Sequence, residues 1–338
     1  MKNYILFVCL FGWLVSLVSC QSVSKQYYTY SGQLHTPFHI KYEYNEPLDE
    51  EIKAELDRFY QLFNVFDSTS VLSQINRNEL DVVEDSTLLT ALHTALTLSS
   101  YTNGAYDITS APLINLWGFG FSKKDSVTPA HIDSIQQFVG YQKLHLKGNR
   151  IQKEDARMSL NCSSLADGTV CDMIADMFDK HGIQNYMVEF GGEIVSKGIN
   201  PRGEYWRLGI TRPTDDASGL NQELQATIHL KGSRRGMATS GNYRNFYLKE
   251  GKKYAHTIDP RAGTPVQRDV LSATVIAPTA QLADACATAC MVIGSDSAAV
   301  LKQQLPEIEY FLICSDDSME YKYVESDGFK DYLIQLKE

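Results

Sequence analysis

The chain has 338 residues, of which 43% are hydrophobic and 21% charged, and its formal net charge is −10. These values are typical of a globular protein with enough apolar surface for one large domain or two closely joined ones. The acidic balance argues against nucleic acid as a partner, because a protein that binds nucleic acid needs a basic face.

The N-terminus predicts export and a lipid anchor. Lys2 precedes an apolar stretch, Tyr4 to Val18, which is too short to span a bilayer comfortably and is typical of a signal peptide. The stretch closes on Leu17-Val18-Ser19-Cys20, which resembles the bacterial lipobox, in which the cysteine is diacylated and becomes the new N-terminus. A plain secretory signal is the alternative. The lipobox predicts lipid attachment at Cys20.

The predicted signal peptide and lipobox determine the expected domain boundaries. We expect a lipoprotein signal peptide over residues 1–19, a polar tether over 20–32 and one folded domain over 33–338. No later segment approaches the roughly 20 apolar residues of a spanning helix. We therefore expect a protein of the cell envelope that is anchored to the inner or outer membrane and faces the periplasm.

Five cysteines remain for the expected mature domain, at 162, 171, 286, 290 and 314. Five is an odd number, no two form a CxxC pair, and each lies within an apolar segment. We interpret them as small core side chains rather than as metal ligands or a redox pair.

Apolar residues at helical spacing predict five helices. The first begins at Asp49, and the second runs from near Ser86 to just before Asn103. The third and fourth cover Pro129–Val139 and Gly168–His181, and the fifth runs from a cap at Thr279 to Ile293. Strand-like runs lie between them at 185–190, 207–211, 224–230, 271–276 and 309–314. The interspersed order predicts an α+β fold with a mixed or antiparallel β core and flanking helices. No GxGxxG follows a strand, and no GxxxxGK[ST] is present.

Two small-residue segments could approach a ligand. Asn103–Leu113 puts small residues beside Asp107 and Thr109, and small residues let a backbone come close to a flat ligand. Asn161–Gly168 leads into a helix, where exposed amides could hold a phosphate. An ordinary turn for the first segment and a simple capping loop for the second are the alternatives.

Three further groups carry functional side chains. Thr239–Tyr243 and His256–Pro260 each lie beside a strand-like run, and His256 has a carboxylate nearby at Asp259. Asp284 and Thr288 are spaced i and i+4 on a helix, so they share one face and offer the oxygen ligands that Mg²⁺ prefers. A surface histidine and an exposed aspartate near a helix start are the commoner explanations of such residues.

Read in order, these segments resemble the ApbE family of FAD:protein FMN transferases from about Gln33 to about Leu336. The blocks that carry the resemblance are Asp67–Asn76, Gly104–Asp107 with Pro112-Leu113, Asn115–Gly120, Ser163–Asp172, Glu189–Gly192, Thr239–Tyr243, His256–Gly263 and Ala283–Thr288. The resemblance implies a T-fold-like single compact unit. It implies an enzyme that uses Mg²⁺ to split FAD, attaches FMN through a phosphoester to a threonine or serine of an extracytoplasmic flavoprotein, and releases AMP.

The resemblance also implies residue roles. The FAD-contact positions are Leu34, Phe66, Ala105, Tyr106, Asp107, Ser163, Thr169 and Ile258. The Mg²⁺ ligands are the carbonyl of Ala166 and the side chains of Asp284 and Thr288, and His256 is the candidate base, so that His256 and Asp284 are the expected catalytic residues. The implied partners are FAD, the membrane, and an acceptor such as a subunit of a membrane-bound redox ion pump.

The chain departs from the family pattern at several of these positions. It has Leu34-His35 where Met-Gly is usual, Phe66 where a hydroxylated aromatic residue is frequent, and Asp167-Gly168-Thr169 where lysine or glutamate precedes Gly-Tyr. It has Ala287 where some members carry an acid. Two other activities fit the same residues: an FAD pyrophosphatase that releases free FMN and AMP, and a flavin-binding lipoprotein that performs no chemistry.

Overall fold

A computed structural model describes residues 25–120, 127–213, 223–241, 246–249, 252–255, 257–315 and 321–337. The predicted signal peptide, Cys20 and His256 lie outside the described residues. In the described part of the chain, no helix is both long enough and apolar enough to cross a membrane.

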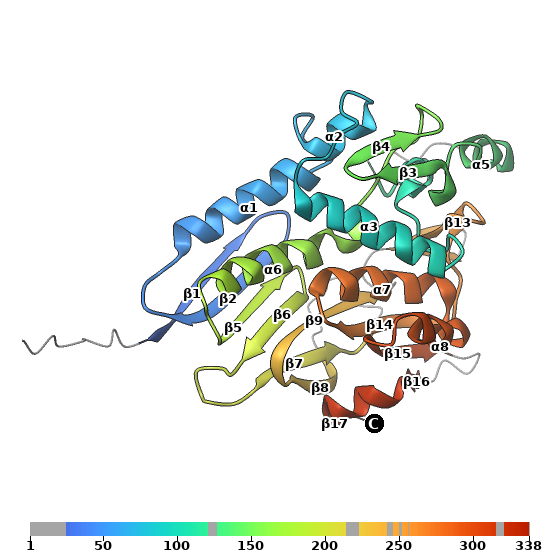
Figure 1. Ribbon diagram of the computed structural model, residues 1–338. Helices are drawn as coiled ribbons and strands as arrows, with labels where there is room; N and C mark the ends of the chain where they lie inside the picture. The colour runs from blue at the N-terminus through green and yellow to red at the C-terminus, as the bar shows by residue number, and fades with distance from the viewer. Residues whose placement is uncertain are drawn as a thin grey trace, which may run out of the picture.

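The centre of the molecule is an eight-stranded antiparallel sheet in the order β1-β2-β5-β6-β9-β14-β15-β16 (Figure 1). Its strands are β1 (Gln26–Gln33), β2 (Pro37–Tyr44), β5 (Tyr186–Phe190), β6 (Glu193–Gly198), β9 (Gly232–Gly241), β14 (Val270–Ala277), β15 (Glu309–Ser315) and β16 (Tyr321–Glu325). The order β2-β5 places a strand from the start of the chain beside one from its middle, and β6-β9-β14 joins the middle to the C-terminal third.

The other strands form small units. A three-stranded sheet has the order β17-β8-β7, with β7 (Trp206–Thr211), β8 (Leu224–Leu230) and β17 (Leu333–Leu336). Two-stranded pairs are formed by β3 (Leu144–Lys147) with β4 (Arg150–Lys153), β10 (Phe246–Lys249) with β11 (Lys252–Ala255), and β12 (Ile258–Asp259) with β13 (Thr264–Pro265).

Helices cover one face of the large sheet (Figure 1). The helices of the described residues are α1 (Asp49–Phe63), α2 (Val71–Asn76), α3 (Ser86–Tyr101), α4 (Ala111–Leu116), α5 (Pro129–Gln136), α6 (Ser163–Lys180), α7 (Ala280–Ile293) and α8 (Ser295–Gln304). Short 3₁₀ turns are η1 (Ile108–Ser110), η2 (Tyr141–Lys143) and η3 (Asp327–Asp331), and Phe329 of η3 packs on the opposite face of the sheet. The helix α6 packs on β5 and β6, α7 packs on β9 and β14, and α3 packs against both helices.

The two faces of the large sheet belong to two cores, because side chains alternate along a strand. Val275 and Ala277 of β14 join the core under the helices, whereas Ile276 between them joins the core shared with β7 and β8. The result is three layers: helices, large sheet and small sheet. The predicted α+β class with an antiparallel core is confirmed.

Several predicted boundaries were wrong. The helix predicted to start at Gly168 begins at Ser163, because this glycine lies inside α6, where it allows close packing, and does not end the preceding loop. The strand β1 begins at Gln26, inside the segment predicted as a tether, because Gln26–Gln33 pairs with β2 along its whole length. The helix predicted to reach Val139 ends at Gln136.

Candidate active site

A polar cavity of about 400 Å³ lies between the helices α6 and α7 and several strand ends and turns. Its lining comes from the turn before η1, the start of α6, the turn between β5 and β6, the end of β9, β12 and one face of α7. Seven residues predicted from the sequence line it: Ala105, Tyr106, Asp107, Ser163, Ile258, Asp284 and Thr288. The fold therefore gathers most of the predicted site at one place.

The start of α7 is fixed by two glycines that flank Ala280. A Cβ atom on Gly168 of α6 would lie 2.4 Å from the carbonyl oxygen of Ala280, and one on Gly236 of β9 would lie 2.2 Å from its nitrogen. Thr279 caps the helix, since its side chain accepts a hydrogen bond from the backbone N–H of Leu282 at 3.2 Å. The position of Asp284, one turn further on, follows from this packing.

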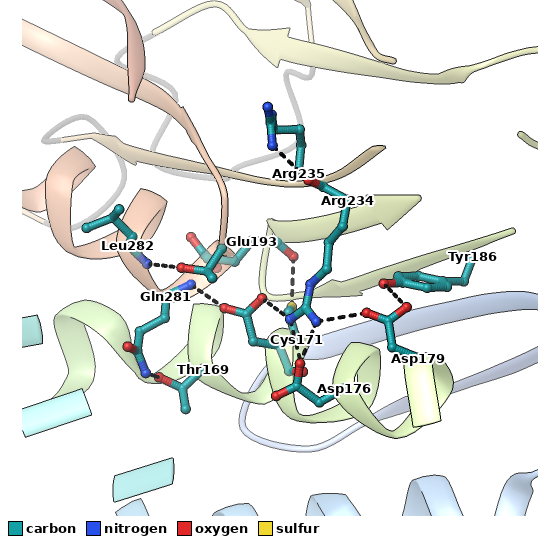
Figure 2. Close-up of polar contacts among 12 residues, drawn as sticks. Thr169, Cys171, Asp176, Asp179, Tyr186, Glu193, Arg234, Arg235, Gln281 and Leu282 are labelled. Carbon is teal, nitrogen blue, oxygen red and sulfur yellow. Dashed lines mark hydrogen bonds and ion pairs between the residues drawn. The ribbon is translucent and has the colours of Figure 1, made fainter. Parts of the chain in front are cut away.

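A buried ionic network adds a second attachment for α7 (Figure 2). One carboxylate oxygen of Asp172 accepts a hydrogen bond from the backbone N–H of Gln281 at 2.8 Å, and the other accepts one from the Arg234 guanidinium at 2.8 Å. Arg234 also pairs with Asp176 and, at 3.1 Å, with Asp179. Burial raises the pKa of Asp172, while the charge of Arg234 opposes that rise. The network joins α6, β9 and α7.

Asp284 and Thr288 reach the cavity from one face of α7, as their spacing predicts. Asp284 is only 6% exposed, and its Oδ2 accepts a hydrogen bond from the backbone N–H of Gly168 at 3.1 Å. Burial, together with the charge of Asp167, raises the pKa of Asp284 to about 8. The hydroxyl of Thr288 lies 3.2 Å from that of Ser240 at the end of β9. A buried carboxylate beside a hydroxyl suits a cation.

Asp107 organises the wall of the cavity. Its Oδ1 accepts a hydrogen bond from the N–H of Thr109 at 2.8 Å and caps η1, and its Oδ2 accepts one from the N–H of Tyr141 at 2.6 Å. Burial raises the pKa of Asp107. Tyr106 beside it is buried, and its hydroxyl accepts a hydrogen bond from Ser164 at 2.9 Å. Because both carboxylate oxygens of Asp107 hold backbone amides, its observed role is structural.

The segment after residue 256 is held by the block that contains Trp117. The indole N–H of Trp117 donates to the carbonyl of Gly263 at 2.8 Å, and Ile258 packs in a small apolar cluster with Leu113. The Asp259 carboxylate accepts hydrogen bonds from the N–H of Arg261 at 3.0 Å and from its guanidinium. Asp259 therefore caps the turn.

Four predicted residues are not among the described residues that line this cavity. Ala166 lies in the first turns of α6, next to Asp167, which does line it. Thr169 is buried, donates to the carbonyl of Leu165 at 2.6 Å and accepts from Gln281. Leu34 is exposed.

Phe66, the fourth of these residues, lines a neighbouring hollow of about 400 Å³. Its side chain is 78% exposed. Asn161 and Ser163 line both hollows, so the two share a wall. The predicted flavin contacts are thus divided between adjoining spaces.

Three residues that line the cavity had no role predicted from the sequence: Asp167 and Ser240, which lie inside segments that the sequence indicated, and Glu193, which lies just outside one. Burial, with Asp284 and Asp167 nearby, raises the pKa of Glu193 well above its usual value. A carboxylate directly after Gly191-Gly192 at the start of a strand is a signal that could have found Glu193.

Comparison with known proteins places this chain in a family. The model of the ApbE family matches residues 34–312. The chain belongs to the ApbE family. An FAD:protein FMN transferase of Vibrio cholerae is 32% identical over 95% of this chain and 99% of the relative. One of Escherichia coli K12 is 33% identical over 86% of this chain and 83% of the relative. The solved structure of the flavin transferase ApbE from Vibrio cholerae superposes with a TM-score of 0.79, at 31% identity, over 91% of this chain and all of that chain (100%).

The donors in this cavity fit a hard cation. Within the described ranges, no group of three or more His, Cys, Asp and Glu side chains is arranged to hold a metal. The donors that meet at α7 are instead one buried carboxylate, Asp284, and one hydroxyl, Thr288. Oxygen donors in small number suit Mg²⁺, which keeps several waters and binds substrate phosphates.

Proposed function

We propose that this protein is an Mg²⁺-dependent FAD:protein FMN transferase. The observation that carries the proposal is the meeting of Asp284 and Thr288 with the flavin-contact positions Ala105, Ser163 and Ile258 in one polar cavity. Membership of a family whose named relatives are FAD:protein FMN transferases supports the same assignment.

The proposed reaction transfers a phosphoryl group. The hydroxyl oxygen of a threonine or serine on the acceptor attacks the phosphorus atom of the FMN half of FAD. A new P–O bond forms to the acceptor, the P–O bond of the pyrophosphate breaks, and AMP leaves. In this class of reaction, positioning and charge stabilisation provide most of the catalysis.

In this reaction the predicted site residues have three roles: to hold Mg²⁺, to accept a proton and to bind the flavin. The carbonyl of Ala166 and the side chains of Asp284 and Thr288 would hold Mg²⁺, which would supply a Lewis acid that neutralises charge on the phosphates. His256 would remove the proton from the acceptor hydroxyl, a task that contributes about 10²- to 10⁴-fold in rate. Ala105, Tyr106 and Asp107 would form one wall of the flavin site.

The proposed setting is the cell envelope. Diacylation of Cys20 would anchor the chain on the periplasmic side of a membrane, within reach of extracytoplasmic flavoproteins. We propose a subunit of a membrane-bound redox ion pump as the acceptor, because such a protein presents its flavin-bearing part in the same compartment.

One incubation tests the proposal against both alternatives. The protein is given FAD with Mg²⁺ or with EDTA, in the presence and absence of an acceptor subunit, and AMP and protein-bound flavin are measured. We expect AMP to form only with acceptor and Mg²⁺, in an amount equal to the flavin that stays on the acceptor after denaturation. Free FMN and AMP without acceptor would identify a pyrophosphatase, and FAD binding without AMP would identify a carrier.

A further inference from the structure

His35 connects the turn between β1 and β2 to the candidate active site. Its Nε2 atom lies 3.0 Å from Oδ1 of Asp167, and its Nδ1 atom lies 2.5 Å from the hydroxyl of Tyr60 on α1. The ring also packs on Phe190, with ring centroids 5.2 Å apart. Both ring nitrogens of His35 are therefore engaged, and the histidine orients Asp167.

His35 and Asp167 come from distant parts of the chain. The two residues are 132 positions apart in the sequence, yet their side chains meet at 3.0 Å.

The two carboxylate oxygens of Asp167 have different neighbours: Oδ1 contacts His35, and Oδ2 lies close to Gly191. A Cβ atom on Gly191 would lie 2.8 Å from Oδ2 of Asp167 and 3.2 Å from Oε2 of Glu193. Gly191 also has a φ of +69°, a conformation that favours glycine. The glycine leaves room for Asp167 to enter the cavity, and Asp167 is among the residues that line it.

Asp167 lies close to Asp284. Asp284 accepts its hydrogen bond from the N–H of Gly168, the residue after Asp167, and both carboxylates line the same cavity. None of the described residues that line the cavity is a lysine or an arginine. A pyrophosphate brought among these carboxylates needs a cation, because like charges at short range repel.

We propose that Asp167 is a second carboxylate ligand of the Mg²⁺ site and that His35 and Tyr60 are its positioning residues. This assignment rests on the proposed function, which supplies the metal. Two carboxylates with substrate phosphates are a common ligand set for Mg²⁺. Metal-ligating side chains are commonly oriented by a second hydrogen-bonding group, whose loss costs about 10- to 100-fold in metal affinity.

Metal binding to the full-length chain in detergent tests the assignment. Calorimetric titration with Mg²⁺, and with Mn²⁺ as a spectroscopic probe, is compared for the wild type and for Asp167→Asn, His35→Leu and Tyr60→Phe. We expect Asp167→Asn to weaken Mn²⁺ binding at least tenfold, and His35→Leu to weaken it about 10- to 100-fold. Tyr60→Phe should have a smaller effect in the same direction. Asp57→Asn, at an exposed aspartate on α1, is the matched control and should bind as the wild type does.

Thermal stability separates a ligand from a structural residue. Without metal, Asp167→Asn should unfold at the same or a higher temperature than the wild type, because it removes a charge beside Asp284. With metal, it should gain less stability than the wild type gains. A residue with a purely structural role would lower the unfolding temperature under both conditions.

Two results would overturn the assignment, and they differ. If Asp167→Asn binds Mn²⁺ within twofold of the wild type while Asp284→Asn does not bind it, Asp167 is not a ligand and the proposed function stands. If the wild type binds neither Mg²⁺ nor Mn²⁺, with or without FAD, both the assignment and the metal dependence of the proposed function are wrong.

Discussion

Gly168 of α6 and Ala280 of α7 touch backbone to backbone, so close that a Cβ atom on the glycine would lie 2.4 Å from the Ala280 carbonyl oxygen. On the opposite side, Gly236 of β9 approaches the Ala280 nitrogen just as closely. The first turn of α7 is therefore held between a helix and a strand. This contact fixes where Asp284 and Thr288 lie.

Substitution of Gly168 by alanine should damage both stability and the site. The added methyl group meets backbone atoms, which cannot rotate away, and overpacking of this kind costs about 1–3 kcal/mol. We expect Gly168→Ala to lower the free energy of unfolding in urea and to weaken Mg²⁺ binding. Gly203→Ala is the control: its φ of +78° strains any alanine, but nothing lies within 4 Å of a Cβ atom there, so metal binding should be kept.

Loss of the Asp172 carboxylate should be strongly destabilising. Asp172 and Arg234 are mostly buried, with side-chain exposures of 12% and 20%, and removal of one partner of a buried pair costs about 3–5 kcal/mol. We expect Asp172→Ala to lose an amount of this order in urea unfolding. Asp155→Ala, which breaks the more exposed pair with Arg157, should lose about 1 kcal/mol or less. Equal losses for the two variants would contradict the role given to the network.

The pKa of Asp284 predicts how stability depends on pH in the absence of metal. Its folded pKa, raised to about 8, lies above the usual value of 3.8, so between these values the folded state keeps a proton that the unfolded state releases. Stability should fall as the pH rises from about 4 to about 8, by up to about 1.4 kcal/mol per pH unit. With EDTA present, Asp284→Asn should show a shallower decline in urea unfolding. An identical slope for both proteins would mean that Asp284 is ionised throughout.

His256→Ala separates chemistry from binding. We expect FAD and Mg²⁺ to bind nearly as in the wild type, while FMN transfer slows by about 10²-fold or more. Transfer by the wild type should also fall as the pH drops and the imidazole becomes charged. Asp259→Asn is the comparison: because Asp259 caps the turn through Arg261, a normal transfer rate in that variant would confine its role to the turn. Transfer by His256→Ala at the wild-type rate, with poor FAD binding, would make His256 a ligand contact.

Cys20→Ser tests the anchor. A lipobox cysteine carries several acyl chains, and each buried CH₂ contributes about 0.8 kcal/mol to membrane binding. The variant should move from the membrane fraction to the soluble fraction after cell disruption, with unchanged activity on FAD. A variant that stays fully membrane-bound would show that another part of the chain holds it there.

The helices were predicted best where a cap and a strong apolar period coincide. Thr279 caps α7, and Asp85 caps α3, which begins at Ser86 as predicted; both starts agree with the structure. The start of α6 was missed because Gly168, a weak helix former, is placed there by contact with α7, which sequence periodicity does not contain. The segment of β1 was predicted as a tether although Tyr27–Tyr30 is rich in residues that favour a strand, and it pairs with β2 along its whole length.

The sequence indicates which segments form the site, but it does not indicate which side chains contact one another there. Asp284 and Thr288 are spaced i and i+4, so their common face follows from helix geometry alone. The contact between His35 and Asp167 joins residues far apart in the chain and requires the three-dimensional fold. The place of Thr169 in the motif predicts a flavin contact, but its side chain is buried and donates to the carbonyl of Leu165.

Two buried cysteines of α7 make it possible to measure the local opening of this helix by chemical modification. Cys286 and Cys290 are fully buried in it, and burial raises the pKa of the Cys290 thiol to about 12. A thiol reagent reacts with the thiolate, so these cysteines are inert until α7 separates from its neighbours. The rate at which a reagent modifies them therefore measures local opening of the helix that bears Asp284. A ligand that bridges α7 to the rest of the cavity should slow that rate without any change to the sequence.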